Sequence, residues 1–189
     1  MTTCVVVGLP TPLLPIHLLW INLVTDGLPA LCLATDPIDS DVMARKPLSR
    51  SAKITDPAFL RTMVYTGLLT AGVAFGVYFH GVRSGSLLAA RTSAFAALVF
   101  AELLRSFGAR SATKPVWRMS FFANLNLSLV VAVSIGIQVL SQHNAMLGRF
   151  LKVSPIPFRD GFILLALGAL PLLVLDLMKG LRAKETRLL

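Results

Sequence analysis

The sequence contains little charge and no grouping of residues that is typical of a hydrolase or a nucleotide-binding site. Only 14% of its 189 residues are charged, whereas 55% are hydrophobic and the mean hydropathy is +0.74. This composition excludes an ordinary soluble domain and predicts an integral membrane protein. No serine, histidine and aspartate set suggests hydrolysis, and no glycine-rich loop suggests phosphate binding. The first dozen residues also lack the basic start and the cleavage site of a signal peptide.

Cysteine and acidic residues are scarce as well. Cys4 and Cys32 lie in apolar surroundings without a CxxC pair, which argues against a disulfide framework or a zinc site, and we interpret both as small packing residues. Nine acidic residues face 18 basic residues, which gives a net charge of +9. The basic residues are dispersed between apolar stretches and form no patch with interleaved aromatic residues. We therefore expect no nucleic-acid partner and attribute the charge distribution to membrane topology.

Five apolar stretches are each close to the ~20 residues that cross a bilayer. They cover residues 13–35, 58–80, 86–107, 121–141 and 159–178. The predicted fold class is therefore all-α, a polytopic transmembrane helix bundle in contact with membrane lipid.

The basic residues of the connections predict the orientation of this bundle. Alternate connections carry thirteen basic residues against five, so the positive-inside rule places residues 36–57, as a loop, and the C-terminus in the cytoplasm. Residues 1–12 are interpreted as the remnant of a preceding transmembrane helix and an external turn, with residues 13–189 forming the membrane domain. We expect further chain upstream, because residues 4–14 are apolar but too short to span.

The first apolar stretch carries polar side chains at its centre. Asn22, Thr25 and Asp26 are spaced i, i+3 and i+4, which places an amide, a hydroxyl and a carboxylate oxygen on one helix face. Pro29 cannot donate a backbone hydrogen bond, so we expect the span to unwind at Gly27–Pro29 and free carbonyl oxygens. An ionisable residue at membrane depth is costly and indicates a functional site, here for a hard cation. The alternative is a polar group that hydrogen-bonds to neighbouring helices.

The third stretch contains a second membrane carboxylate, Glu102, three residues before Arg105. This spacing allows an ion pair on one helix face. Otherwise Glu102 is a further oxygen ligand or a proton-carrying group. Both interpretations remain open from the sequence.

Other spans carry residues for which a structural role is expected. Gly72 and Gly76 form a GxxxG motif, which predicts close helix packing. Asn124 and Gln138 are among several polar residues of the fourth span for which we expect interhelical hydrogen bonds. Asp176 lies three residues before Lys179, which predicts an ion pair.

The run LLPIHLLWINLVTDGLPALCLATDPIDSDVMARKP resembles the sixth transmembrane helix and following cytoplasmic loop of P-type cation-transporting ATPases, specifically the sarco/endoplasmic-reticulum-type calcium pump branch. The core NLVTDGLPA is the most specific part. Residues 4–14 are similar to the end of the fifth helix of this family, and the later spans are similar to the seventh to tenth helices. The resemblance thus covers the whole chain.

The resemblance implies that Asn22, Thr25 and Asp26 are cation ligands, with Asp26 bridging two ion sites. Glu102 in LVFAELL matches the eighth-helix glutamate of the family and is implied to be a further ligand. Calcium is the implied transported ion, with manganese as a close second. The implied localisation is a multi-pass protein of the plasma membrane.

The family motifs of the catalytic domains do not occur in this chain. There is no DKTGT phosphorylation motif, no TGE motif and no nucleotide-binding domain, so we expect no ATP hydrolysis by this chain alone, and whether it forms part of an enzyme stays open. ATP and magnesium are implied only for a complete pump, whose N-terminal part is supplied by the same or a separate chain. The rival interpretation is a non-catalytic polytopic membrane protein that packs with or regulates an intact pump.

Overall fold

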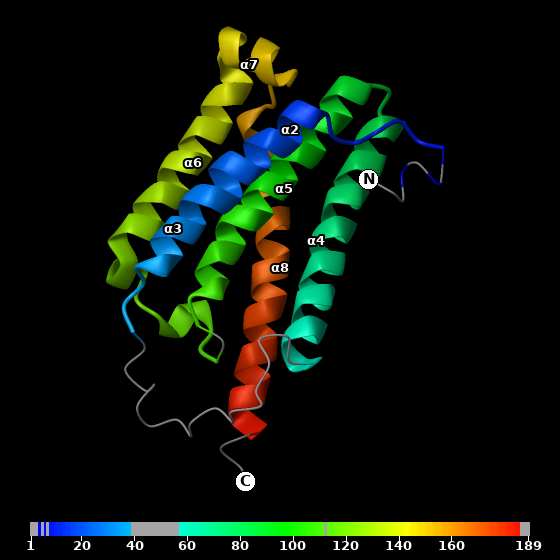
Figure 1. Ribbon diagram of the computed structural model, residues 1–189. Coiled ribbons are helices and arrows are strands. Elements are labelled where there is room, and N and C mark those ends of the chain that lie inside the picture. The colour runs from blue at the N-terminus through cyan, green and yellow to red at the C-terminus, as the bar shows by residue number, and fades with distance from the viewer. Residues whose placement is uncertain (1–3, 5, 7, 39–56, 112, 186–189) are drawn as a thin grey trace.

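The computed structural model describes residues 4, 6, 8–38, 57–111 and 113–185, and all the regular structure in these residues is helical (Figure 1). The helices are α2 (Pro15–Trp20), η1 (Ile21–Gly27), α3 (Leu28–Ala34), α4 (Pro57–Arg83), α5 (Leu87–Ala109), η3 (Val116–Arg118), η4 (Phe121–Asn124), α6 (Leu125–His143), α7 (Ala145–Leu151) and α8 (Phe158–Glu185). The predicted all-α fold is confirmed.

Five segments of the described chain are long and apolar enough to cross a membrane. They are Pro15–Ala34, Phe59–Arg83, Leu87–Ala109, Leu125–His143 and Phe158–Gly180. The five predicted spans are therefore present, with ends that move by a few residues. Residues 1–3, 5 and 7 of the predicted helix remnant and residues 39–56 of the predicted loop lie outside the described residues.

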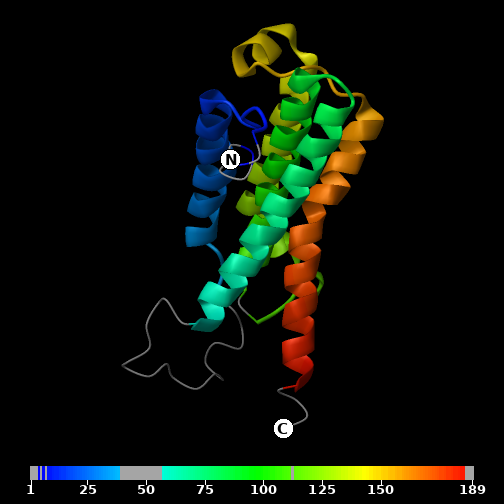
Figure 2. The same ribbon diagram turned by 90° about the vertical axis from the view of Figure 1, so that its right-hand side faces the viewer.

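Helix α5 is the centre of the bundle. Of its membrane-spanning window 56% is buried, against 22 to 33% for the other four spans. Figures 1 and 2 show α2 and α3 on one side of α5 and α4 and α8 on the other. The sequence of α5 explains this position, because Ala90, Ala94, Ala96, Ala97 and Ala101 are at most 2% exposed and let neighbouring backbones approach.

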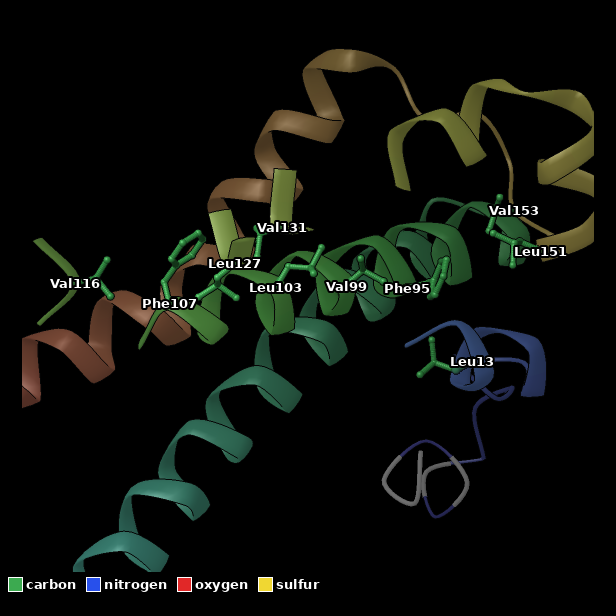
Figure 3. Close-up of a cluster of buried hydrophobic side chains, with 10 residues drawn as sticks. All are labelled: Leu13, Phe95, Val99, Leu103, Phe107, Val116, Leu127, Val131, Leu151 and Val153. Carbon is green, nitrogen blue, oxygen red and sulfur yellow. The ribbon is translucent and has the colours of Figure 1, made fainter. Parts of the chain in front are cut away.

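The largest buried apolar cluster follows α5 from one end of the bundle to the other (Figure 3). Its members come from α5, α6, η3, α7 and the segments before α2 and after α7: Leu13, Phe95, Val99, Leu103, Phe107, Val116, Leu127, Val131, Leu151 and Val153. We call the end of the bundle that carries Leu13 and Leu151 the α7 end, and the opposite end, where α3 finishes, the Asp36 end. The cluster joins the two ends through α5.

At the Asp36 end, α8 is tied to the connection that follows α5. Asp176 Oδ2 accepts a hydrogen bond from Val116 N at 2.7 Å, and Lys179 Nζ donates to Gly108 O at 2.6 Å. Lys179 Nζ also lies 3.7 Å from Asp176 Oδ1, so the predicted ion pair is confirmed.

The predicted packing of Gly72 and Gly76 against another helix was wrong for the described chain. A Cβ atom built on either residue meets nothing within 4 Å. Both glycines line an open groove of about 600 Å³ between α4 and α8. Small residues permit close approach but do not produce it, and α4 meets α5 at Gly81 instead, where an added Cβ would lie 2.7 Å from Ala90 Cα.

Gly168 marks a close approach of α8 to α5. A Cβ at this position would lie 2.9 Å from Phe100 Cβ and 3.0 Å from Ala101 N. Because a backbone atom cannot move aside without shifting its helix, we expect Gly168→Ala to destabilise the bundle by roughly 1–3 kcal/mol. Thermal unfolding in detergent micelles measures this loss.

Gly76→Ala is the matched control, because its added methyl group meets open space. It should leave the unfolding temperature unchanged or raise it slightly through better helix propensity. Equal unfolding temperatures for the two variants would contradict the assigned contact between α5 and α8.

Candidate cation site

The first span changes its helix type at its polar centre. Residues Ile21–Gly27 form a π-helix, η1, between the α-helical segments α2 and α3. The prediction that the span unwinds at Gly27–Pro29 was wrong. Gly27 (φ −65°, ψ −53°) and Leu28 (φ −67°, ψ −48°) both keep helical dihedral angles. The interruption is a widened turn that begins six residues before Gly27.

Pro29 gives a physical reason for the wider turn. It lies in the first turn of α3, where a proline is tolerated because its missing N–H is not required. In a continuous α-helix its ring would clash with the carbonyl one turn earlier, and the π-turn places this carbonyl differently. Gly27 belongs to the same geometry, since a Cβ there would lie only 3.3 Å from Asn22 O.

The three polar side chains of η1 do not share one environment. Asn22 and Asp26 are exposed on the surface of the bundle, whereas Thr25 is buried at 3% exposure. The Thr25 hydroxyl donates a hydrogen bond to Ile21 O at 2.6 Å and lies 3.5 Å from Asp26 Oδ1. With its hydrogen used on Ile21 O, the Thr25 oxygen keeps lone pairs for a cation.

Glu102 comes from α5, the helix on which η1 packs. Its Oε2 is paired with Nη2 of Arg105, so the predicted i, i+3 ion pair is present. Asp26 exerts a weak electrostatic influence on Glu102, and the two carboxylates belong to elements, η1 and α5, that pack on each other. The structure thus brings Asp26 and Glu102 into one region and leaves Oε1 of Glu102 outside the pair with Arg105.

Taken together, the site has hard oxygen donors but too few of them. Asn22, Thr25, Asp26 and Glu102 supply fewer side-chain groups than the six to eight oxygens that calcium prefers. Within the described ranges no group of three or more histidine, cysteine, aspartate and glutamate side chains could hold a metal ion.

The first span, Pro15–Ala34, carries the candidate site, and we call it the site span. Its end next to Asp36 is held by a polar cluster that the sequence did not reveal. Asp36 Oδ1 accepts hydrogen bonds from Arg110 Nε at 3.2 Å and from Asn124 Nδ2 at 2.7 Å. Asn124 Nδ2 also donates to Cys32 O at 3.0 Å, which confirms its expected interhelical hydrogen bond. Asp36 was assigned to the cytoplasmic loop, and no local spacing links it to partners 74 and 88 residues away.

The α7 end of the site span is held by His17, which is fully buried. Leu14 N donates to His17 Nδ1 at 3.3 Å, so Nε2 carries the hydrogen and donates to Leu151 O at 2.8 Å. The ring stacks on Phe95 of α5 at 4.4 Å between centroids. Midway, Trp20 Nε1 donates to Gln138 Oε1 at 3.1 Å, as expected for the polar residues of α6.

Comparisons with known proteins identify the family of the chain. The chain matches the family "Cation transporting ATPase, C-terminus" over residues 10–181. It is 35% identical over 192 residues to calcium-transporting ATPase 1 of Bacillus cereus, which covers 93% of this chain and 22% of that protein. It is 34% identical over 178 residues to the calcium-transporting ATPase of Bacillus subtilis, covering 93% of this chain and 20% of that protein.

A eukaryotic relative shows a similar match. The chain is 29% identical over 181 residues to calcium-transporting ATPase 1 of Schizosaccharomyces pombe, covering 95% of this chain and 20% of that protein. The chain therefore spans about a fifth of the length of these relatives. The family resemblance of the sequence is confirmed: the chain belongs to the P-type cation-transporting ATPases and corresponds to their C-terminal membrane domain.

Proposed function

We propose that this chain is the C-terminal membrane part of an ATP-driven calcium transporter, in which it supplies part of the intramembrane ion site. One observation carries the proposal: Asn22 and Asp26 are exposed on an apolar span beside a second carboxylate, Glu102, on the neighbouring span. Polar side chains so placed require a polar partner, since lipid cannot solvate them. The relatives are calcium-transporting ATPases, which supports calcium as the transported ion.

The proposed ligands are Asn22, Thr25 and Asp26 of η1 and Glu102 of α5. The amide oxygen of Asn22, the hydroxyl of Thr25 and both carboxylates are donors that calcium and manganese both accept, and the relatives favour calcium. The remaining oxygens would come from the N-terminal part of the pump, in the same or a separate chain. ATP and magnesium would act in that part, away from this domain.

The rival function is a non-catalytic polytopic membrane protein that packs with or regulates an intact pump. Such a protein needs the helix contacts of α5 and α8 but has no use for an uncovered carboxylate on a span. The exposed Asp26 therefore favours the transporter. We place the protein in the cell membrane as a multi-pass component.

Asp26→Asn in the complete pump tests the ligand assignment. The substitution keeps the size of the side chain but removes its charge, so calcium-dependent phosphorylation from ATP should require at least about tenfold more calcium. Asp160→Asn, which removes the same charge from an exposed position in α8, is the control and should leave the calcium requirement unchanged. Undiminished phosphorylation at low calcium in Asp26→Asn would contradict the assignment.

A pair of substitutions separates the two roles of Glu102. If Glu102 binds the ion, Glu102→Gln should raise the calcium requirement by about tenfold, whereas Arg105→Gln frees the carboxylate and should change it by less than about twofold. Phosphorylation assays over a range of calcium concentrations measure both variants. Equal losses in the two variants would mean that the ion pair itself is what the pump needs.

The size of the native polypeptide separates the transporter from the rival. Because the chain spans about a fifth of its relatives, an antibody against residues 36–57 should detect a band several times heavier than 20.4 kDa in the source membrane. A band at 20.4 kDa that copurifies with no larger pump subunit would contradict the proposed function.

A further inference from the structure

A second polar site lies at the α7 end of the bundle, away from η1. It is a pocket of about 530 Å³ lined by the start of α5, the end of α6, part of α7 and the segment that follows α7. Its lining includes two cationic side chains, Arg149 and Lys152, and no acidic one. We propose that this pocket binds the phosphate group of an anionic phospholipid, independently of the ion-transport function.

A buried amide in the pocket wall lacks a partner. Gln142 is only 6% exposed, and its Nε2 atom has no hydrogen-bond acceptor among the residues that the structure describes. A buried amide without an acceptor is costly, so the Gln142 side chain gains a hydrogen bond if it turns Nε2 toward a ligand oxygen in the pocket that it lines. This donor distinguishes the pocket from a patch of surface lysines.

Cationic side chains surround this amide. Arg149 and Lys152 line the pocket, and neither forms an ion pair within the described part of the chain. Lys152 ends α7 in the left-handed conformation (φ 53°, ψ 46°), which is uncommon for a residue other than glycine. Both cationic side chains line the same pocket as Gln142, so the two charges and the amide form a donor set for phosphate oxygens.

Apolar side chains beside the pocket favour a lipid over a soluble anion. Met146 and Phe150 of α7 are 82% and 63% exposed and share one helix face, and Phe158 at the start of α8 is 66% exposed. Short helices with exposed apolar and basic residues lie in the membrane interface, where acyl chains and headgroups meet. The apolar face would contact the acyl chains while the pocket holds the headgroup phosphate.

Native mass spectrometry of the complete protein in detergent, titrated with phosphatidylglycerol or phosphatidylcholine, tests the proposal. We expect tighter binding of phosphatidylglycerol. Arg149→Gln should weaken this binding about fivefold, and Gln142→Leu about tenfold. Arg149→Lys, which keeps the charge at an exposed position, should retain most of the affinity.

Arg83→Gln is the matched control for charge. Arg83 lies at the same end of the bundle, over the Phe79 ring and outside the pocket, so its removal should leave phosphatidylglycerol binding unchanged. Equal binding of the two lipids, or equal losses in Arg83→Gln and Arg149→Gln, would overturn the proposal. Binding of inorganic phosphate with the same dependence on Arg149 and Gln142 would assign the pocket to a soluble anion and overturn the lipid assignment.

Discussion

Pro29 has no backbone N–H, and the hydrocarbon core of a bilayer contains no water that could replace it. A membrane span must satisfy its backbone within itself, so a proline in the middle of a span forces a local rearrangement. In this chain the rearrangement is the π-helix η1, whose seven residues contain Asn22, Thr25 and Asp26. The donor groups of the candidate site therefore lie on the one stretch of the span whose backbone departs from the α-helix.

The rest of the bundle supports this stretch from one side. Helix α5 contributes small, buried side chains along most of its length and a single carboxylate, Glu102, near η1. Its alanines bring α4 and α8 close on the opposite side, and its aromatic residue Phe95 stacks on His17 at the start of the site span. One helix thus organises the packing and also supplies the second carboxylate of the candidate site.

Much of this architecture follows from local sequence patterns. Hydrophobic length located all five spans, and the i, i+3 spacing anticipated the Glu102–Arg105 and Asp176–Lys179 pairs, because both signals depend on neighbours within one helix. The form of the break at Pro29 could not be predicted, since a glycine and proline indicate a loosened helix but not whether it widens or unwinds.

Contacts between distant segments could not be predicted from the sequence, for a different reason. The bonds from Asp36 to Arg110 and from His17 to Leu151 join residues 74 and 134 positions apart, and only the assembled bundle brings them together. The prediction that Gly72 and Gly76 pack against another helix was wrong for the same reason. Their spacing places them on one face of α4, but no local pattern indicates which element that face contacts.

The two ends of the site span are held by hydrogen bonds, and its middle is a π-helix. His17 is bonded to Leu151 at one end, and Asp36 is bonded to Arg110 and Asn124 at the other. A π-turn is wider and shorter per residue than an α-turn, so the span is shorter than an α-helix with the same number of residues. An α-helical η1 would set the two ends farther apart, so the bonds of His17 and Asp36 fit the span only in its π-helical form.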